Sequence, residues 1–146
     1  MAEFERNANV VWEGSLADGS GTVSAGSGAF ENLPVSWAAR VERVEGTSPE
    51  ELVAAAHAAC YAMALSHTLT QGGTPPERLA VSAVVSGELG DAGLVVKTSE
   101  LSVSAFVPGL DQAEFDRRAH DAERNCPISN ALRGAVEIRL NATLES

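Results

Sequence analysis

The sequence predicts an α+β fold in which antiparallel β-sheets wrap around one long, buried central helix. Three observations lead to this prediction. Hairpin-like strand pairs precede and follow a single long apolar helix, a strictly alternating segment ends the chain, and the strand–helix–strand repeat of parallel sheets is missing. With 146 residues and no linker or internal repeat, the chain is expected to form a single domain over residues 1–146.

The first third of the chain reads as short strands joined by turns. ANVVWEGSL and GTVSAGSGAF flank the pair Asp18-Gly19, which is typical of tight hairpins. The segment LPVSWAARVERV, residues 33–44, is expected to return as a further strand region, with Arg40 following a core strand at the end of the apolar stretch LPVSWAAR. The glycines of GSGTVSAGSG lack the Lys-Ser/Thr ending of a P-loop, so they do not indicate a phosphate site.

A long helix is predicted from Pro49 to about Gln71. Ser48 is a favoured N-cap, proline suits the first helical position, and Glu51 completes a capping-box pattern. Two glycines then end the helix. Its middle, LVAAAHAACYAMAL, has no polar face of useful width. We therefore expect this helix to be covered on most sides, by sheet or by a second copy of the chain.

The second half of the chain predicts a hairpin, a helix and a final strand. LAVSAVVSGEL and LVVKTSELSVSAFV, separated by GDAG, form the hairpin. Asp111 and Glu114 mark the start of an amphipathic helix, DQAEFDRRAHDAERN, and a short helical turn is expected at Cys126-Pro127. In VEIRLNATL, apolar and polar residues alternate strictly, which is the clearest strand pattern in the sequence.

Composition excludes several classes of function. The 20 acidic and 10 basic side chains give a net charge of −10, which repels phosphate backbones and anionic membranes. We therefore expect no nucleic-acid or membrane partner. The longest apolar run, residues 52–65, is shorter than the roughly 20 residues of a membrane span. MAEFERNANVVWEG lacks the pattern of a secretory signal, so a cytoplasmic location is expected.

The two cysteines, Cys60 and Cys126, are the main candidates for chemistry. A permanent disulfide is unusual in a reducing compartment, so redox or metal chemistry competes with plain burial as their explanation. Burial in the middle of a helix raises the pKa of Cys60, so a reactive Cys60 needs a cation. Arg40 is the best placed by pattern, and Glu50 could hold it. Cys126 precedes a helix start, where a thiolate is favoured and a resolving thiol would be well placed.

Glu50 and Cys60 cannot meet within one straight helix. They are ten positions apart, which is about 15 Å along the helix axis, and they lie on different faces. If both belong to one site, an antiparallel second copy of the helix must bring its Glu50 alongside Cys60. This argument predicts a symmetric dimer with two sites at its interface.

Other interpretations stay open at this point. His57, Cys60, His120 and Cys126 could bind a metal, although the sequence contains no CxxC-type pair. The chain could instead be a non-catalytic stress protein whose apolar cavity binds a hydrophobic small molecule. It could also be a structural stress protein that acts through its dimeric surface.

GTSPEELVAAAHAACYAMALSH around Cys60, NCPIS around Cys126 and the order of elements resemble the OsmC/Ohr family of thiol-dependent organic hydroperoxide reductases. The resemblance covers about residues 11–144. It favours the OsmC-like branch, because SLADGSGTVS has no arginine where the Ohr branch carries its active-site arginine, and Arg40 fills the OsmC-like position. It implies an intertwined homodimer with two interface sites, and it requires no metal, haem or flavin.

The resemblance also implies roles for the site residues. Cys60 would be the peroxidatic thiolate, Arg40 would stabilise it, Glu50 would hold Arg40, and Cys126 would resolve the sulfenic acid as a disulfide. The implied reaction reduces organic hydroperoxides to alcohols in oxidative or osmotic stress defence. A dithiol reductant, such as a lipoyl-bearing protein, would reopen the disulfide. A pocket of small aliphatic side chains, with Tyr61 and Met63 as neighbours, is expected to favour alkyl or fatty-acid hydroperoxides over hydrogen peroxide.

Overall fold

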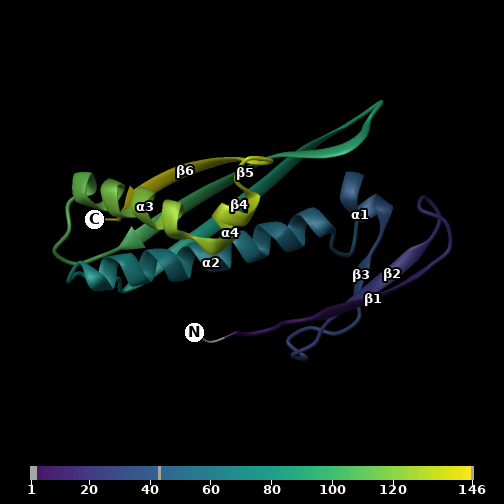
Figure 1. Ribbon diagram of the computed structural model, residues 1–146, viewed down its shortest axis with the longest axis horizontal. Helices are drawn as coiled ribbons and strands as arrows, with labels where there is room; N and C mark the ends of the chain where they lie inside the picture. Colours follow the sequence, from purple (N-terminus) through teal and green to yellow (C-terminus); the bar gives the residue numbers. More distant parts are fainter. Residues whose placement is uncertain (1–2, 43, 146) are drawn as a thin grey trace. The chain divides into compact units, whose positions relative to one another are not determined.

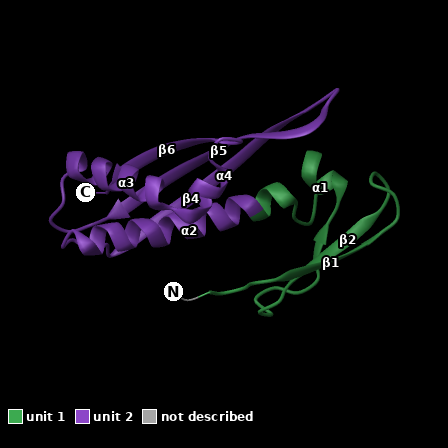
Figure 2. Ribbon diagram, in the orientation of Figure 1, with its two compact units in different colours: residues 1–52 green, residues 53–146 purple. Residues whose placement is uncertain are grey.

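The computed structural model describes residues 3–42 and 44–145, and within them it contains two three-stranded sheets and four helices (Figure 1). The chain divides into two compact units, residues 1–52 and residues 53–146 (Figure 2). The mixed α+β class, with small sheets and a long central helix, is confirmed.

The first unit contains an antiparallel sheet with the strand order β1-β2-β3. Its strands are β1 (Ala8–Glu13), β2 (Ser20–Ala25) and β3 (Leu33–Val35). Gly19 closes the predicted hairpin turn by donating its N–H to the Ser15 carbonyl at 2.8 Å. A Cβ atom at this glycine would lie 2.3 Å from the same carbonyl oxygen, so the tight turn requires glycine.

The strand expected over residues 33–44 is wrong beyond Val35. A short helix, α1 (Trp37–Val41), follows β3, while residue 43 lies outside the described residues. Ser36 caps this helix, because its Oγ accepts the N–H of Ala39 at 3.0 Å. Because most of the segment is apolar, its sequence did not indicate that Ser36 is a helix N-cap. Arg40 follows the strand β3, as expected, but it lies in the last turn of this short helix.

The predicted long helix is present as α2 (Pro49–Gln71). Ser48 Oγ accepts the Glu51 N–H at 3.1 Å, which is the expected cap, but the Glu51 carboxylate accepts the Thr47 hydroxyl at 2.7 Å. The capping box is therefore only half formed. By length and composition alone, α2 is the one helix among the described residues that could cross a membrane, a criterion that core helices of globular proteins also meet.

The second unit contains a mixed sheet with the order β4-β5-β6. The strands β4 (Arg78–Gly90) and β5 (Gly93–Phe106) form the predicted antiparallel hairpin, but β6 (Glu137–Leu144) pairs with β5 in parallel. The expectation of purely antiparallel sheets is wrong here. The connection from β5 to β6 carries α3 (Gln112–Asn125) and α4 (Pro127–Leu132), and a helical crossover of this kind returns the chain for parallel pairing.

The core of this unit lies between the sheet and the helices α2 and α3 (Figure 1). A stripe along α2 with a spacing of four residues is buried, and it packs against β5 and α3: His57, Tyr61, Leu65 and Leu69. The opposite side of α2 stays open, and Met63 is 73% exposed. We expected α2 to be buried on most sides, but within this chain only one side of α2 is buried.

His57 is a fully buried polar residue in this core. Its Nδ1 lies 2.7 Å from Ser99 Oγ on β5, and its Nε2 lies 2.7 Å from Ser129 Oγ on α4. Burial lowers the pKa of His57 below its ordinary value, nearby Glu123 opposes this effect, and Arg133 adds to it. The folded protein therefore favours a neutral imidazole that is hydrogen-bonded at both nitrogens.

We predict that this histidine lowers the free energy of unfolding as the pH falls below about 6.5, the ordinary histidine pKa. Between this pKa and the lower pKa of folded His57, the unfolded chain binds a proton that the folded protein does not bind. Below the folded-state pKa both states are protonated, so no further stability is lost. Histidine ring NMR should give a lower titration midpoint for His57 in the folded protein than in the denatured protein. An equal or higher midpoint in the folded protein would contradict this expectation.

Candidate active site

Cys60 and Cys126 meet as free thiols within the second unit. Cys60 lies in the middle of α2 and is partly buried, whereas Cys126 is fully buried and caps the N-terminus of α4. The two thiols are neighbours, and the Cys126 thiol is one of the groups that raise the pKa of Cys60. The fold thus brings together two cysteines that are distant in the sequence.

The first turn of α4 directs two backbone N–H groups at these sulfurs. Ser129 donates its N–H to Cys126 Sγ at 3.5 Å, and the Ile128 N–H lies near the Cys60 sulfur, where it lowers the pKa of that thiol. These N–H groups belong to the first helical turn, where no partner exists within the helix. Pro127 occupies the first helical position, where its missing N–H costs nothing.

Burial is the main cause that raises the pKa of Cys60 above its ordinary value. The Ile128 N–H lowers this pKa, and the contact with Cys126 raises it further. The Cys60 thiol therefore gives up its proton less readily than an ordinary cysteine. A thiolate at this position needs additional positive charge, as the sequence analysis anticipated.

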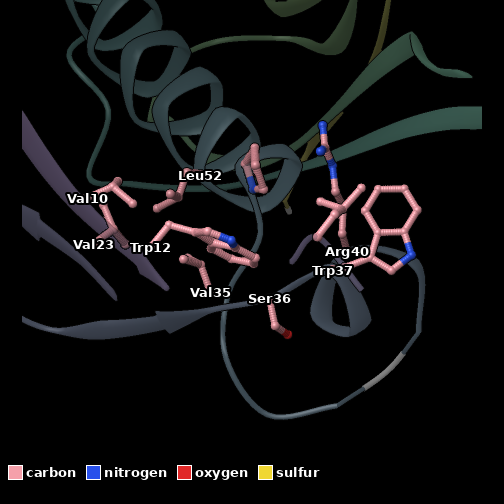
Figure 3. A pocket seen from close by; sticks show the side chains of 10 residues that line it. Val10, Trp12, Val23, Val35, Ser36, Trp37, Arg40 and Leu52 are labelled. Carbon is pink, nitrogen blue, oxygen red and sulfur yellow. The ribbon is translucent and has the colours of Figure 1, made fainter. Parts of the chain in front are cut away.

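Arg40 and Glu50 form a two-pronged ion pair within the first unit. Nε of Arg40 lies 2.8 and 3.1 Å from the two carboxylate oxygens of Glu50, and Nη2 lies 2.9 Å from Oε2. The side chains are 30% and 19% exposed. The Trp37 ring lies under the guanidinium, with its centroid 5.9 Å from Cζ (Figure 3). Glu50, in the first turn of α2, thereby fixes the orientation of a partly buried cation.

A cavity of about 340 Å³ opens beside Arg40 in the same unit (Figure 3). Its wall is largely apolar and comes from β1, β2, β3, α1 and the start of α2: Val10, Trp12, Leu16, Val23, Val35, Ser36, Trp37, Arg40, Pro49 and Leu52. The volume lies within the range of small-molecule pockets. One cation on an apolar wall suits a ligand with a single polar group and an organic remainder.

A second cavity, of about 510 Å³, contains Cys60 in the second unit. Met63 and His67, on the same face of α2, also line it. Met63 was expected here, but the expectation that Tyr61 lines the pocket is wrong. Tyr61 is fully buried in the core, and its hydroxyl donates to the Ala119 carbonyl at 2.9 Å. Adjacent helical residues differ by about 100° in direction, so Tyr61 cannot share the face of Cys60.

The metal interpretation finds no geometric support. Both ring nitrogens of His57 are occupied by serine hydroxyls, and His120 is exposed on α3 with Nδ1 2.8 Å from the Asp116 carbonyl. Among residues 3–42 and 44–145, no group of three or more histidine, cysteine or acidic side chains is arranged to hold a metal.

The structure therefore pairs the four candidate residues two by two. Arg40 contacts Glu50 in the first unit, and Cys60 contacts Cys126 in the second. Sequence reasoning missed the backbone donors of α4 and the hydroxyls around His57. The NCPIS segment indicated a helix start, but nothing local to it specified which N–H would face which sulfur.

Comparison with known proteins places these residues in a family. The family model of OsmC-like protein matches residues 42–141. The peroxiredoxin OsmC of Escherichia coli K12 is 41% identical over 143 residues, which covers 98% of this chain and 99% of that protein. An organic hydroperoxide resistance protein of Xanthomonas axonopodis pv. citri is 38% identical over 99 residues, 66% of each chain.

Solved structures agree with the sequence comparison. The crystal structure of an organic hydroperoxide resistance protein OsmC from Legionella pneumophila superposes with a TM-score of 0.76 at 26% identity. The match covers 98% of this chain and 99% of that one. With a family model matched over most of its length and a 41% identical relative of nearly equal extent, this chain belongs to the OsmC family.

Proposed function

We propose that this protein is a cytoplasmic, thiol-dependent peroxidase that reduces organic hydroperoxides to alcohols in oxidative or osmotic stress defence. The observation that carries the proposal is the contact between two free cysteines, one of which lines a cavity. The names of the relatives, peroxiredoxin OsmC and organic hydroperoxide resistance protein, support a peroxide-stress role.

The proposed cycle uses both thiols. The Cys60 thiolate attacks the terminal oxygen of the hydroperoxide, the O–O bond breaks, and the alkoxide takes a proton and leaves as the alcohol. Cys60 is then a sulfenic acid, two electrons more oxidised than the thiol. The Cys126 sulfur attacks the Cys60 sulfur, water leaves, and a disulfide forms. A small dithiol, for example on a lipoyl-bearing protein, returns two electrons and two protons by thiol–disulfide exchange.

Arg40 supplies the positive charge that the thiolate needs. Burial raises the pKa of Cys60, and a guanidinium stays charged at any physiological pH. Glu50 binds Nε and Nη2 of Arg40, whereas Nη1 makes no hydrogen bond within the described part of the chain. We propose that this remaining donor stabilises the thiolate and orients the peroxide oxygens.

We further propose that the active form is a homodimer. Glu50 and Cys60 stand ten residues apart on α2, about 15 Å along one helix, so the Arg40–Glu50 pair of one copy would serve Cys60 of the other. Exposed apolar side chains support a partner surface. Val10 and Val11 on β1 are 59% and 62% exposed, and Met63 beside Cys60 is 73% exposed.

The cavity beside Arg40 supports a preference for organic substrates. Its walls contain two tryptophans and several aliphatic side chains. Such walls bind the alkyl chain of an organic hydroperoxide more favourably than they bind hydrogen peroxide, which has no apolar part. Each methylene group that enters such a pocket contributes about 0.8 kcal/mol. The same cavity is also the observation that favours the alternative function, a protein that binds hydrophobic small molecules without catalysis.

The two-thiol cycle predicts distinct mass changes after one equivalent of cumene hydroperoxide is added to the reduced protein. The parent protein should lose two hydrogens as the Cys60–Cys126 disulfide forms. The Cys126→Ser variant should gain one oxygen on Cys60, because no resolving thiol is available. Intact-mass and peptide mass spectrometry measure both changes.

The matched control for this experiment is the Cys60→Ser variant, which keeps Cys126 and should show no change in mass. Unchanged masses for the parent protein would contradict the peroxidase cycle and favour the binding protein. An oxygen added first to Cys126 would reverse the proposed roles of the two cysteines.

The shared-site dimer predicts that two inactive variants complement each other. Mixed dimers of Arg40→Ala and Cys60→Ser chains, purified through two different tags, should recover about half of the parent peroxidase activity, because one of two symmetric sites is intact. Each variant alone should be inactive. The reciprocal control pairs a parent chain with an Arg40→Ala/Cys60→Ser chain, which should be inactive. Activity only in this control, or a fully active monomer in sedimentation, would rule out the shared site.

A further inference from the structure

His57 joins three elements of the second unit through buried hydrogen bonds. The ring lies on α2, three residues before Cys60, and its nitrogens contact Ser99 on β5 and Ser129 on α4. The N–H of the same Ser129 donates to Cys126 Sγ. The ring is therefore one hydrogen-bonded residue away from the second thiol, on the helix that carries the first.

We propose that His57 is a positioning residue for the thiol pair, and that its hydrogen bond to Ser129 holds the first turn of α4, and with it Cys126, against Cys60. The role in resolving a sulfenic acid rests on the proposed function. The geometric role does not, because any two-electron oxidation of the pair requires the same approach of the sulfurs.

The short helix α4 needs such an anchor. It has only six residues, and a helix of this length is not stable without tertiary contacts. A disulfide requires a sulfur–sulfur distance of about 2.05 Å and a narrow range of dihedral angles. Small shifts of the α4 start would therefore reduce the fraction of molecules in which Cys126 can reach Cys60.

Cys126 and Ile128 also pack in the hydrophobic core, but the other polar contacts of α4 do not replace this anchor. Arg133, the residue that ends α4, binds the carboxylate of Glu123 at 2.8 Å, which ties α4 to α3. The Ile128 N–H reaches α2, but its acceptor is the Cys60 sulfur, which changes when Cys60 is oxidised. The hydrogen bond between His57 and Ser129 involves no sulfur, so oxidation of Cys60 leaves both of its atoms unchanged.

Ser99 provides the second half of the arrangement. A neutral imidazole has one donor and one acceptor nitrogen, and the two serine hydroxyls complete both. The bond to Ser99 ties α2 to β5, a strand that carries neither cysteine. No buried side-chain nitrogen or oxygen is left without a partner among the described residues, so the network is closed.

The equilibrium between the protein dithiol and glutathione disulfide tests this inference without any peroxide. The reaction converts the dithiol and one glutathione disulfide into the protein disulfide and two glutathione thiols, and its equilibrium constant reports how well Cys126 is placed at Cys60. Without the hydrogen bond between His57 and Ser129, α4 leaves its docked position in part of the dithiol molecules, whereas the disulfide itself holds α4 in place. The Ser129→Ala variant should therefore lower this constant by up to about fivefold, the factor that one net hydrogen bond supports.

Ser99→Ala is the matched control, because it removes a hydroxyl at the same 2.7 Å distance from the same ring. Its equilibrium constant should change less than twofold, since β5 carries neither cysteine. Ser129→Thr keeps the hydroxyl and should restore the constant to within twofold of the parent. An unchanged constant in Ser129→Ala, equal losses in both alanine variants, or no restoration by threonine would overturn the proposal.

The result separates this inference from the proposed function. A fivefold loss in Ser129→Ala, together with no reaction of Cys60 with hydroperoxide, would keep the positioning role and reject the peroxidase. An unchanged constant in a protein that consumes hydroperoxide would reject only the positioning role. Thermal unfolding of both alanine variants checks that a general loss of stability, expected alike in each, does not explain the difference.

Discussion

The contact between the middle of α2 and the first turn of α4 is the interaction on which the chemistry of this protein depends. It brings Cys126 to Cys60, and it supplies two backbone N–H groups to their sulfurs. The same burial that makes the contact possible raises the pKa of Cys60. The burial that brings the two thiols together therefore also makes the Cys60 thiolate less stable. A nearby cation is needed to lower the pKa of Cys60 again.

In the proposed mechanism the Arg40–Glu50 pair supplies this cation, because a guanidinium held by a carboxylate is an oriented and permanently charged donor. Its cost is the desolvation of two charges, which the two-pronged geometry and partial exposure reduce. The cavity beside the cation is largely apolar, which supports the proposed preference for organic hydroperoxides. The open side of α2 and the exposed face of β1 are consistent with a second copy that completes the site.

Local signals predicted much of this fold. Ser48 and Pro49 set the start of α2, and Asp111 caps α3 as expected. The strict alternation of the last strand predicted β6 but not its parallel direction, which depends on the crossover before it. Contacts between distant residues could not be predicted. Ser99 and Ser129 lie 42 and 72 positions from His57, and no local pattern links hydroxyls so far apart to one ring.

The second-order rate constant for Cys60 oxidation, measured across a series of substrates, tests whether this thiol pair acts on organic hydroperoxides. Stopped-flow measurements with hydrogen peroxide and with n-alkyl hydroperoxides of increasing length would provide it. We expect the rate constant to rise up to about fourfold with each added methylene group, until the alkyl chain fills the pocket. Equal rate constants for hydrogen peroxide and the longest alkyl hydroperoxide would contradict it.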